Sequence, residues 1–223
     1  MRRIPFTVDE TYHVYNRGTE KRKIFTSVPD HKRFLALLFL ANGENTVHIS
    51  NEIQTSLPHL LSLDRGKPLV DICAHCLMPN HFHLMLREIR NGGISRFMQK
   101  LQTGYTMYFN TRQKRSGVLF QGKYKATHVA DDRYFKYLVS YIHLNPVKLI
   151  EPTWKETGIA NRRAAEKFLD GYRWSSFHDY TREKRLESRI VNAAALSEYF
   201  DSPLDFKSQV SEWLDFRVES AAP

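Results

Sequence analysis

Residues 69–87 constrain the fold of this chain more than any other stretch. Segment 69–77 contains the β-branched residues Val70 and Ile72 among other apolar side chains, segment 81–87 contains Phe and long apolar side chains, and Pro79-Asn80 lies between the two segments. Runs of this length and composition are typical of strands, and a short link containing Pro and Asn is typical of a tight turn. The sequence therefore predicts an antiparallel hairpin.

The second strand of this hairpin carries two histidines. His81 and His83 are two residues apart, so on a strand both imidazoles share one face while Phe82 and Leu84 point to the other. Two neighbouring imidazoles can hold a divalent metal ion at two points. A bare His-x-His pair also arises by chance on the polar face of a strand, so the spacing alone does not define a metal site.

The remaining periodic segments predict further strands and helices. A strand is expected over 11–16, where β-branched and aromatic residues cluster. Helical spacing of apolar residues follows Asp30 and Ser95, each of which can cap a helix N-terminus. A further helix is expected to begin at Asp131-Asp132, because an acidic pair suits the N-terminal end of the helix dipole. The chain is therefore expected to combine an antiparallel sheet with helices.

The domain organisation is expected to be simple. Residues 1–180 form one domain, in which 44–68 show no firm period and are predicted to be an insertion or a long connection. Ser56-Leu57-Pro58 is expected to break this segment. Residues 181–223 are acidic and are expected to form a C-terminal extension with two short helices.

Composition bounds the class of protein. The chain has 223 residues, of which 42% are apolar and 13% aromatic, and this is enough for a sizeable core. No run approaches the length of a membrane span, and the first residues lack the apolar segment of a secretory signal, so a cytoplasmic protein without membrane association is expected. With only two cysteines, Cys73 and Cys76, disulfides are not expected to hold the fold.

The net charge of +9 is unevenly distributed. Residues 186–223 contain three basic and seven acidic residues, a local charge of −4, so residues 1–185 carry +13. A basic body attracts polyanions, of which nucleic acid is the commonest, although attraction to a membrane surface and plain solubility are competing explanations.

Basic and aromatic residues interleave between glycines over 113–125. Cations can hold a phosphate backbone and aromatic rings can stack on unpaired bases, so this composition suits single-stranded nucleic acid. The candidate contacts within it are Arg115, Lys123, Tyr124 and Lys125. A basic hairpin loop with core aromatics has the same composition, so the segment alone does not establish binding.

The helix expected from Asp131 to Pro146 carries two kinds of face. One apolar stripe, expected to be buried, consists of Phe135, Leu138, Val139 and Ile142. The adjoining face, at the margin between core and solvent, carries Tyr134, Tyr137, Tyr141 and Asn145. Taken alone, this second face is explained without any catalytic role: its tyrosines form an aromatic edge to the core, and Asn145 is an ordinary residue near the helix C-terminus.

Five motifs occur in a fixed order along the chain. They are Tyr12-His13-Val14-Tyr15-Asn16-Arg17-Gly18, Met78-Pro79-Asn80-His81-Phe82-His83, Arg115-Ser116-Gly117 with Phe120-Gln121-Gly122-Lys123-Tyr124-Lys125, Tyr141-Ile142-His143-Leu144-Asn145-Pro146-Val147, and Tyr172-Arg173-Trp174-Ser175-Ser176. With these motifs, residues 8–180 resemble the REP-associated tyrosine transposases, a branch of the single-tyrosine HUH transposase family.

The resemblance implies an α+β fold, with an antiparallel sheet flanked by helices (an RRM-like HUH nuclease fold) and a short helical C-terminal extension. His81 and His83 match the paired metal ligands of the family, and Tyr141 matches its nucleophile. Asn145 stands where related enzymes have a polar third ligand, often glutamine, so its direct coordination is an open question. Arg17 lies in a matching motif and joins the candidate DNA contacts.

The implied function is that of a metal-dependent single-stranded DNA endonuclease and strand transferase, acting on hairpin-forming repeats as a monomer or homodimer. Mg²⁺ or Mn²⁺ held by imidazoles and an amide oxygen would neutralise charge on the scissile phosphate. The tyrosine would form a 5′-phosphotyrosine intermediate that a 3′-hydroxyl can reverse. A phenol with a pKa of about 10 is a poor nucleophile at neutral pH, so it needs assistance.

Two other functions are open on the sequence alone. One alternative to the enzyme is a catalytically inactive nucleic-acid-binding protein of the same fold, acting as a repressor or RNA binder. The other is a zinc module that uses Cys73 and Cys76 with the histidine pair. Against zinc, the odd separation of the two cysteines would place them on opposite faces of a flat strand. Within the enzyme hypothesis, Tyr137 competes with Tyr141 as nucleophile.

Overall fold

A computed structural model of the protein describes residues 5–46, 49, 52–181, 185–197 and 199–214. Its centre is a four-stranded antiparallel sheet with the order β2-β3-β1-β4. The strands are β1 (Thr11–Arg17), β2 (Val70–Met78), β3 (His81–Glu88) and β4 (Lys125–His128). The predicted hairpin and the predicted first strand are confirmed, and β4 was not predicted.

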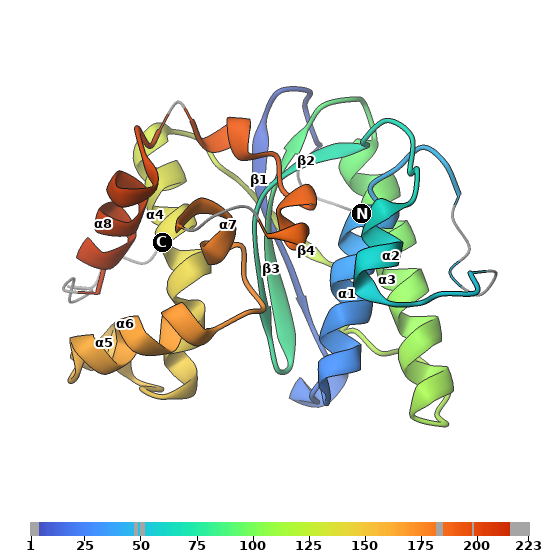
Figure 1. Ribbon diagram of the computed structural model, residues 1–223, viewed down its shortest axis with the longest axis horizontal. Helices are drawn as coiled ribbons and strands as arrows, with labels where there is room; N and C mark the ends of the chain where they lie inside the picture. The colour runs from blue at the N-terminus through green and yellow to red at the C-terminus, as the bar shows by residue number, and fades with distance from the viewer. Residues whose placement is uncertain (1–4, 47–48, 50–51, 182–184, 198, 215–223) are drawn as a thin grey trace.

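Helices cover both faces of the sheet, which Figure 1 shows nearly edge-on between two helical layers. One layer consists of α1 (Val28–Leu40), α2 (Leu57–Ser62) and α3 (Gly93–Arg112). The other consists of α4 (Asp132–Leu144), α5 (Trp154–Thr157), α6 (Arg162–Gly171), α7 (Phe177–Thr181) and α8 (Pro203–Glu212). Short 3-10 turns are η1 (Thr19–Lys21), η3 (Asn145–Leu149), η4 (Leu186–Arg189) and η5 (Ala193–Leu196). The α+β fold class is therefore confirmed. Across the described ranges, no helix combines the length and apolar character needed to cross a membrane.

The sheet separates two hydrophobic clusters. The cluster between the sheet and α1 and α3 contains Val14, Phe82 and Leu84, all fully buried. The cluster on the α4 side contains Met85 from β3 and Leu138 from α4. Because side chains of a strand alternate between faces, β3 contributes to both clusters along its length.

β2 lies at one end of the strand order but is buried along its whole length. Its outer edge hydrogen-bonds to a returning segment, through Leu77 N to Trp174 O at 2.9 Å and Ser176 N to His75 O at 2.9 Å. This pairing satisfies the backbone groups that an edge strand would otherwise expose. The near-continuous apolar composition of β2 fits a strand buried on both faces.

Two predictions about helix N-termini are wrong. Ser27, not Asp30, precedes α1, and Asp30 lies in the first turn, where its carboxylate accepts hydrogen bonds from Thr26. α3 begins at Gly93, before Ser95. Its first N–H groups donate to the buried carboxylate of Glu88, the last residue of β3.

Segment 44–68 contains a helix that was predicted to be a break. α2 begins just after Ser56, and Pro58 lies in its first turn. Proline suits this position because the first N–H groups of a helix have no partner within the helix. The prediction treated proline as a terminator, although proline ends a helix only when it lies in the interior.

The described part of the C-terminal segment contributes to the α4-side core. Phe206, Val210 and Leu214 are buried in the same cluster as Leu138. Tyr199 stacks on Phe135 of α4 with 3.9 Å between ring centroids. This segment therefore helps to hold α4 in place.

Candidate active site

β3 presents the histidine pair on the α4 side of the sheet. His83 is 5% exposed and His81 is half-buried, whereas Phe82 between them is fully buried on the opposite face. The two imidazole centroids are 4.9 Å apart. The predicted alternation along the strand is confirmed.

The strand register places further polar side chains in rows beside the two histidines. Residues directly opposite in an antiparallel ladder share a face. One row, from β2 to β4, consists of Cys76, His83, Tyr15 and Lys125. The adjacent row, from β2 to β1, consists of Met78, His81 and Arg17. Arg17 and Lys125 therefore lie on the same face as the histidine pair.

His13 of β1 is a site residue that the sequence analysis did not identify. Its Nε2 lies 2.8 Å from Nδ1 of His83, and the two rings stack with centroids 5.1 Å apart. His13 is 8% exposed. Its position in a matching motif was a signal, but only the register between β1 and β3 brings it to His83.

α4 positions Tyr141 next to the imidazole rings of His13 and His83. Asp131 caps the helix, because its side chain accepts a hydrogen bond from Tyr134 N at 2.7 Å. The buried stripe of α4 packs toward β2 and β3, which leaves Tyr141 at the border of the core. The ring of Tyr141 lies 5.4 Å from that of His83 and 5.9 Å from that of His13.

The competing tyrosine occupies a different environment. The ring of Tyr137 contacts Trp213 at 5.0 Å and Tyr141 at 5.9 Å between centroids. Tyr137 therefore lies between the C-terminal segment and Tyr141, whereas Tyr141 contacts the histidine cluster.

Two opposing effects act on the Tyr141 hydroxyl. Burial raises the pKa of Tyr141, and a hydrogen bond from the Asn145 side chain works in the opposite direction. Burial has the larger effect, so the pKa lies above the ordinary value and the phenol is protonated at neutral pH.

Asn145 is 2% exposed and belongs to the same local unit as Tyr141. Its Nδ2 donates a hydrogen bond to the carbonyl oxygen of Tyr141 at 3.1 Å. One turn of helix separates the two residues, which brings them onto one face. The side chain of Asn145 therefore interacts with both the backbone carbonyl and the side-chain hydroxyl of Tyr141.

A buried hydrogen-bond bridge anchors the helix that carries Tyr141. His143 is fully buried and lies 2.8 Å from Val139 O through Nδ1 and 2.8 Å from Ser176 Oγ through Nε2. Ser176 Oγ also accepts a hydrogen bond from His75 N of β2 at 2.9 Å. Burial lowers the pKa of His143 to about 4, so the imidazole is neutral at physiological pH.

The predicted nucleic-acid contacts fall into two groups. Lys123 and Lys125 are exposed, as is Arg17, whose guanidinium donates to Gln121. By contrast, Arg115 donates hydrogen bonds to Asn110 in the last turn of α3 and to Val118 O in its own loop, and Tyr124 packs partly against the α1 and α3 cluster. Arg115 and Tyr124 thus shape the loop.

The two cysteines lie in the same buried cluster, so the predicted placement on opposite faces is wrong. A register shift between Ile72 and Ala74 inserts an extra residue into β2 and changes the alternation. Burial raises the pKa of Cys73 to about 12 and raises that of Cys76 further, so both stay protonated, whereas zinc binds thiolates. Within the described residues, no three His, Cys, Asp or Glu side chains gather as a metal site.

Comparison with known proteins gives a family match and a similar fold. Residues 36–145 match the family model described as "Transposase IS200 like". A solved structure of a REP-associated tyrosine transposase bound to a REP hairpin is similar over 84% of this chain and 89% of that chain, with a TM-score of 0.52 and 14% sequence identity. The likeness to that structure shows the shared fold. No curated protein matches the chain.

Proposed function

Because this chain belongs to the IS200-like transposase family, we propose that it nicks and rejoins single-stranded DNA through a covalent tyrosine intermediate. One observation carries this proposal: the ring of Tyr141 lies 5.4 Å from that of His83, on the sheet face that carries both histidines. A nucleophile and a pair of potential metal ligands from distant parts of the chain thus meet at one place.

His81 and His83 are the residues that would hold a divalent ion, Mg²⁺ or Mn²⁺. Metal-binding imidazoles usually donate their second N–H to another group, which orients the ring. Nδ1 of His81 lies 2.7 Å from Asn80 Oδ1, and Nδ1 of His83 lies 2.8 Å from His13 Nε2. A proton on each Nδ1 places the lone pair of each ring on Nε2, so the donor set fits this requirement.

Asn145 is the candidate third ligand through its amide oxygen, since its amide nitrogen donates to Tyr141 O. When bound, the ion would withdraw negative charge from the scissile phosphate. The protein's own contribution is to fix the two imidazoles by their neighbours and to hold Asn145 one turn after the nucleophile.

Tyr141 performs the covalent step. Its phenolic oxygen forms a bond to phosphorus, the bond from phosphorus to the 3′ oxygen breaks, and the phenol proton passes to a base as the 3′ oxygen becomes a hydroxyl. The product is a 5′-phosphotyrosine that retains the energy of the broken ester. A 3′-hydroxyl from a second strand reverses the step and joins new ends.

The substrate proposed for this site is single-stranded DNA next to a hairpin-forming repeat. Arg17 and Lys125 lie on the site face and Lys123 is exposed beside them, so cations border the position of a scissile phosphate. The similar solved protein is bound to a hairpin of this kind.

A labelled hairpin with a single-stranded flank, incubated with protein and Mn²⁺, tests this proposal through a denaturant-resistant adduct. We expect the adduct with wild type and with Tyr137→Phe, the matched control, and none with Tyr141→Phe. His81→Ala and His83→Ala should bind the DNA but form no adduct.

Two outcomes would overturn the proposal. Wild type that binds DNA but never forms an adduct would indicate a nucleic-acid-binding protein without nicking activity. Loss of the adduct in Tyr137→Phe, with retention in Tyr141→Phe, would show that the assigned nucleophile is wrong.

A further inference from the structure

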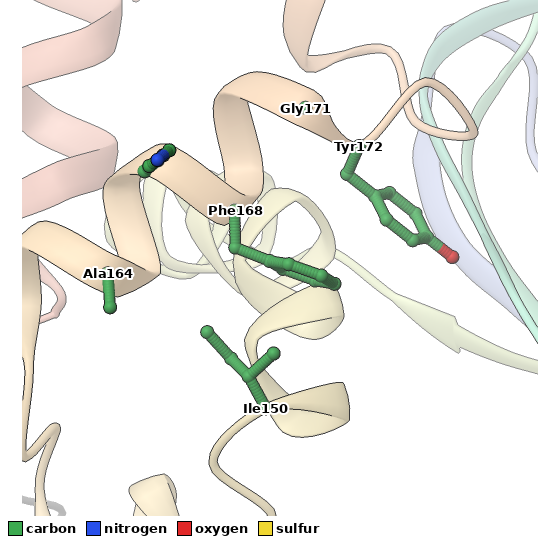
Figure 2. Close-up of a pocket in the computed structure, with 6 residues that line it drawn as sticks. Ile150, Ala164, Phe168, Gly171 and Tyr172 are labelled. Atoms are coloured by element: carbon green, nitrogen blue, oxygen red, sulfur yellow. The ribbon is translucent and has the colours of Figure 1, made fainter.

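An apolar pocket lies between η3 and α6, next to the candidate active site. Its volume is about 500 Å³, which falls within the range of roughly 300–1,000 Å³ that is common for small-ligand sites. Figure 2 shows the side chain of Ile150 directed toward the ring of Phe168, with Tyr172 on the side nearest the sheet. The lining residues are Ile150, Ala164, Lys167, Phe168, Gly171 and Tyr172.

Both walls of the pocket are connected to the active site. Tyr172 donates a hydrogen bond through its hydroxyl to Leu77 O of β2 at 2.5 Å, and Leu77 pairs with Phe82, between the two histidines. The other wall follows η3, which begins at Asn145 and ends just before Ile150. η3 packs against both α6 and β2.

The pocket and the basic residues flank the histidines on opposite sides. In the strand order β2-β3-β1-β4, Arg17 and Lys125 belong to β1 and β4, whereas the pocket adjoins β2. His81 pairs with Arg17 on one side and with Met78 on the other, so all of these groups lie at the same end of the sheet. A strand held by the cations and passing over His81 would continue toward the pocket.

Lys167 is the cation of the pocket that an anionic ligand could pair with. The carboxylates next to the lining residues have other partners: Glu151 accepts from the backbone N–H groups of Ala160 and Asn161, Glu166 pairs with Arg162 at 3.0 Å, and Asp170 pairs with Lys207 at 3.4 Å. Lys167, which lines the pocket, is exposed and makes no ion pair with the described residues. An aromatic ring beside an exposed cation is the combination that binds a base together with its phosphate.

We propose that this pocket binds one nucleobase of the single-stranded DNA that crosses the active site, stacked on Phe168 with Lys167 at the adjacent phosphate. The inference rests on the proposed function for the direction of the strand, but base binding does not require cleavage. The pocket would then fix the position of the strand on the β2 side, while the cations of β1 and β4 fix it on the other.

The test uses oligothymidine strands that carry a single 2-aminopurine at successive positions. We expect wild-type protein to quench the fluorescence strongly at one position, because the base stacks on Phe168. Phe168→Leu keeps the apolar volume but removes the ring, so the quenching should disappear and affinity should fall about tenfold. Phe168→Trp should restore both, and Met107→Ala on the exposed surface of α3 should change neither.

Salt dependence tests the cation separately. Lys167→Gln should lower the slope of log affinity against log salt by about 0.7, the value for one phosphate contact in single-stranded nucleic acid. The quenching at the selected position should persist in this variant, because the ring is unchanged.

Adduct formation at Tyr141 distinguishes the failure of this inference from that of the proposed function. An adduct with wild type, together with unchanged quenching and affinity in Phe168→Leu, would overturn the pocket inference alone. Ring-dependent quenching without any adduct would support the pocket and overturn the nicking activity. Light scattering that shows a dimer lost in Phe168→Leu would also overturn the inference, since the pocket would then bind a second copy.

Discussion

Alternate residues of β3 meet two different environments. Phe82 and Leu84 are fully buried under α1 and α3, whereas His81 and His83 face α4 together with a half-buried tyrosine. One strand therefore supplies packing on one face and polar groups on the other. The difference shows how a residue that stabilises the fold and one suited to chemistry can be adjacent in the chain without sharing a role.

Two buried polar groups on the α1 side of the sheet also differ from each other. Burial raises the pKa of Asp30, but hydrogen bonds from Thr26 and Ser27 together with the charge of Arg112 lower it below the ordinary value. His75 of β2 pairs with Leu84 and is equally buried, but neither ring nitrogen has a hydrogen-bond partner. Leaving a buried imidazole unpaired costs free energy, whereas the carboxylate of Asp30 is satisfied.

The largest expected effect comes from the packed face. Phe82→Ala removes a fully buried ring, so the free energy of unfolding should fall by about 3–5 kcal/mol. His81→Ala, one residue earlier, should change stability by less than about 1 kcal/mol but abolish the adduct. Urea denaturation of both variants checks this contrast, and equal losses of stability would contradict the separation of roles.

The second test uses acid. Burial lowers the pKa of His75 to about 3, whereas the unfolded side chain takes up a proton below about pH 6.5. The unfolded state then binds more protons, so stability is complete above pH 6.5 and is lost as pH falls, by roughly 2 kcal/mol at pH 5. His75→Leu should reduce this loss in denaturation curves recorded at pH 7 and pH 5. The same pH dependence in both proteins would show that His75 is not responsible.

The bridge to α4 should have a smaller effect. Ser176→Ala removes the hydroxyl that contacts His143 and His75, and unsatisfied buried groups of this kind cost about 1–2 kcal/mol. Ser197→Ala is the control, because its exposed hydroxyl donates only to a local carbonyl and its loss should be nearly neutral. Thermal denaturation checks the difference, and similar midpoints for the two variants would argue against the bridge.

The smallest expected effect concerns Asn145. Asn145→Ala removes the hydrogen bond that lowers the pKa of Tyr141, so less phenolate forms at a given pH and adduct formation should slow about fivefold. The rate should recover at higher pH. The Mn²⁺ concentration needed for half-maximal rate should also rise, because Asn145 is the candidate third ligand. An unchanged Mn²⁺ dependence would restrict Asn145 to its hydrogen bond with Tyr141.

Local patterns predicted most of the sheet and the principal helices. The hairpin, the first strand and the helix with Tyr141 follow from alternation, helical spacing and an acidic pair at a helix N-terminus, all of which act over a few residues. β4 was missed because it has only four residues and no buried side chain. The start of α3 was misplaced because Glu88 caps it from the end of a strand.

Relations between distant segments decide what local patterns could not predict. A bulge in β2 places Cys73 and Cys76 in one cluster, although their spacing predicted opposite faces. Arg115 and Tyr124 stay predicted nucleic-acid contacts, and the structure adds that both side chains also hold their loop. Side-chain type shows what a residue can bind, whereas the tertiary structure shows which partners within the chain it already has.

The sequence by itself determined that His81 and His83 share one face of a strand and that Tyr141 and Asn145 share one face of a helix. These results depend on periods of two and 3.6 residues, which are properties of the local backbone. Only the tertiary structure decided that His13, 70 residues before His83, supports its imidazole, and that Tyr141 faces the same cluster. Strand register and the packing of α4 set these contacts, and both depend on side chains far apart in the chain.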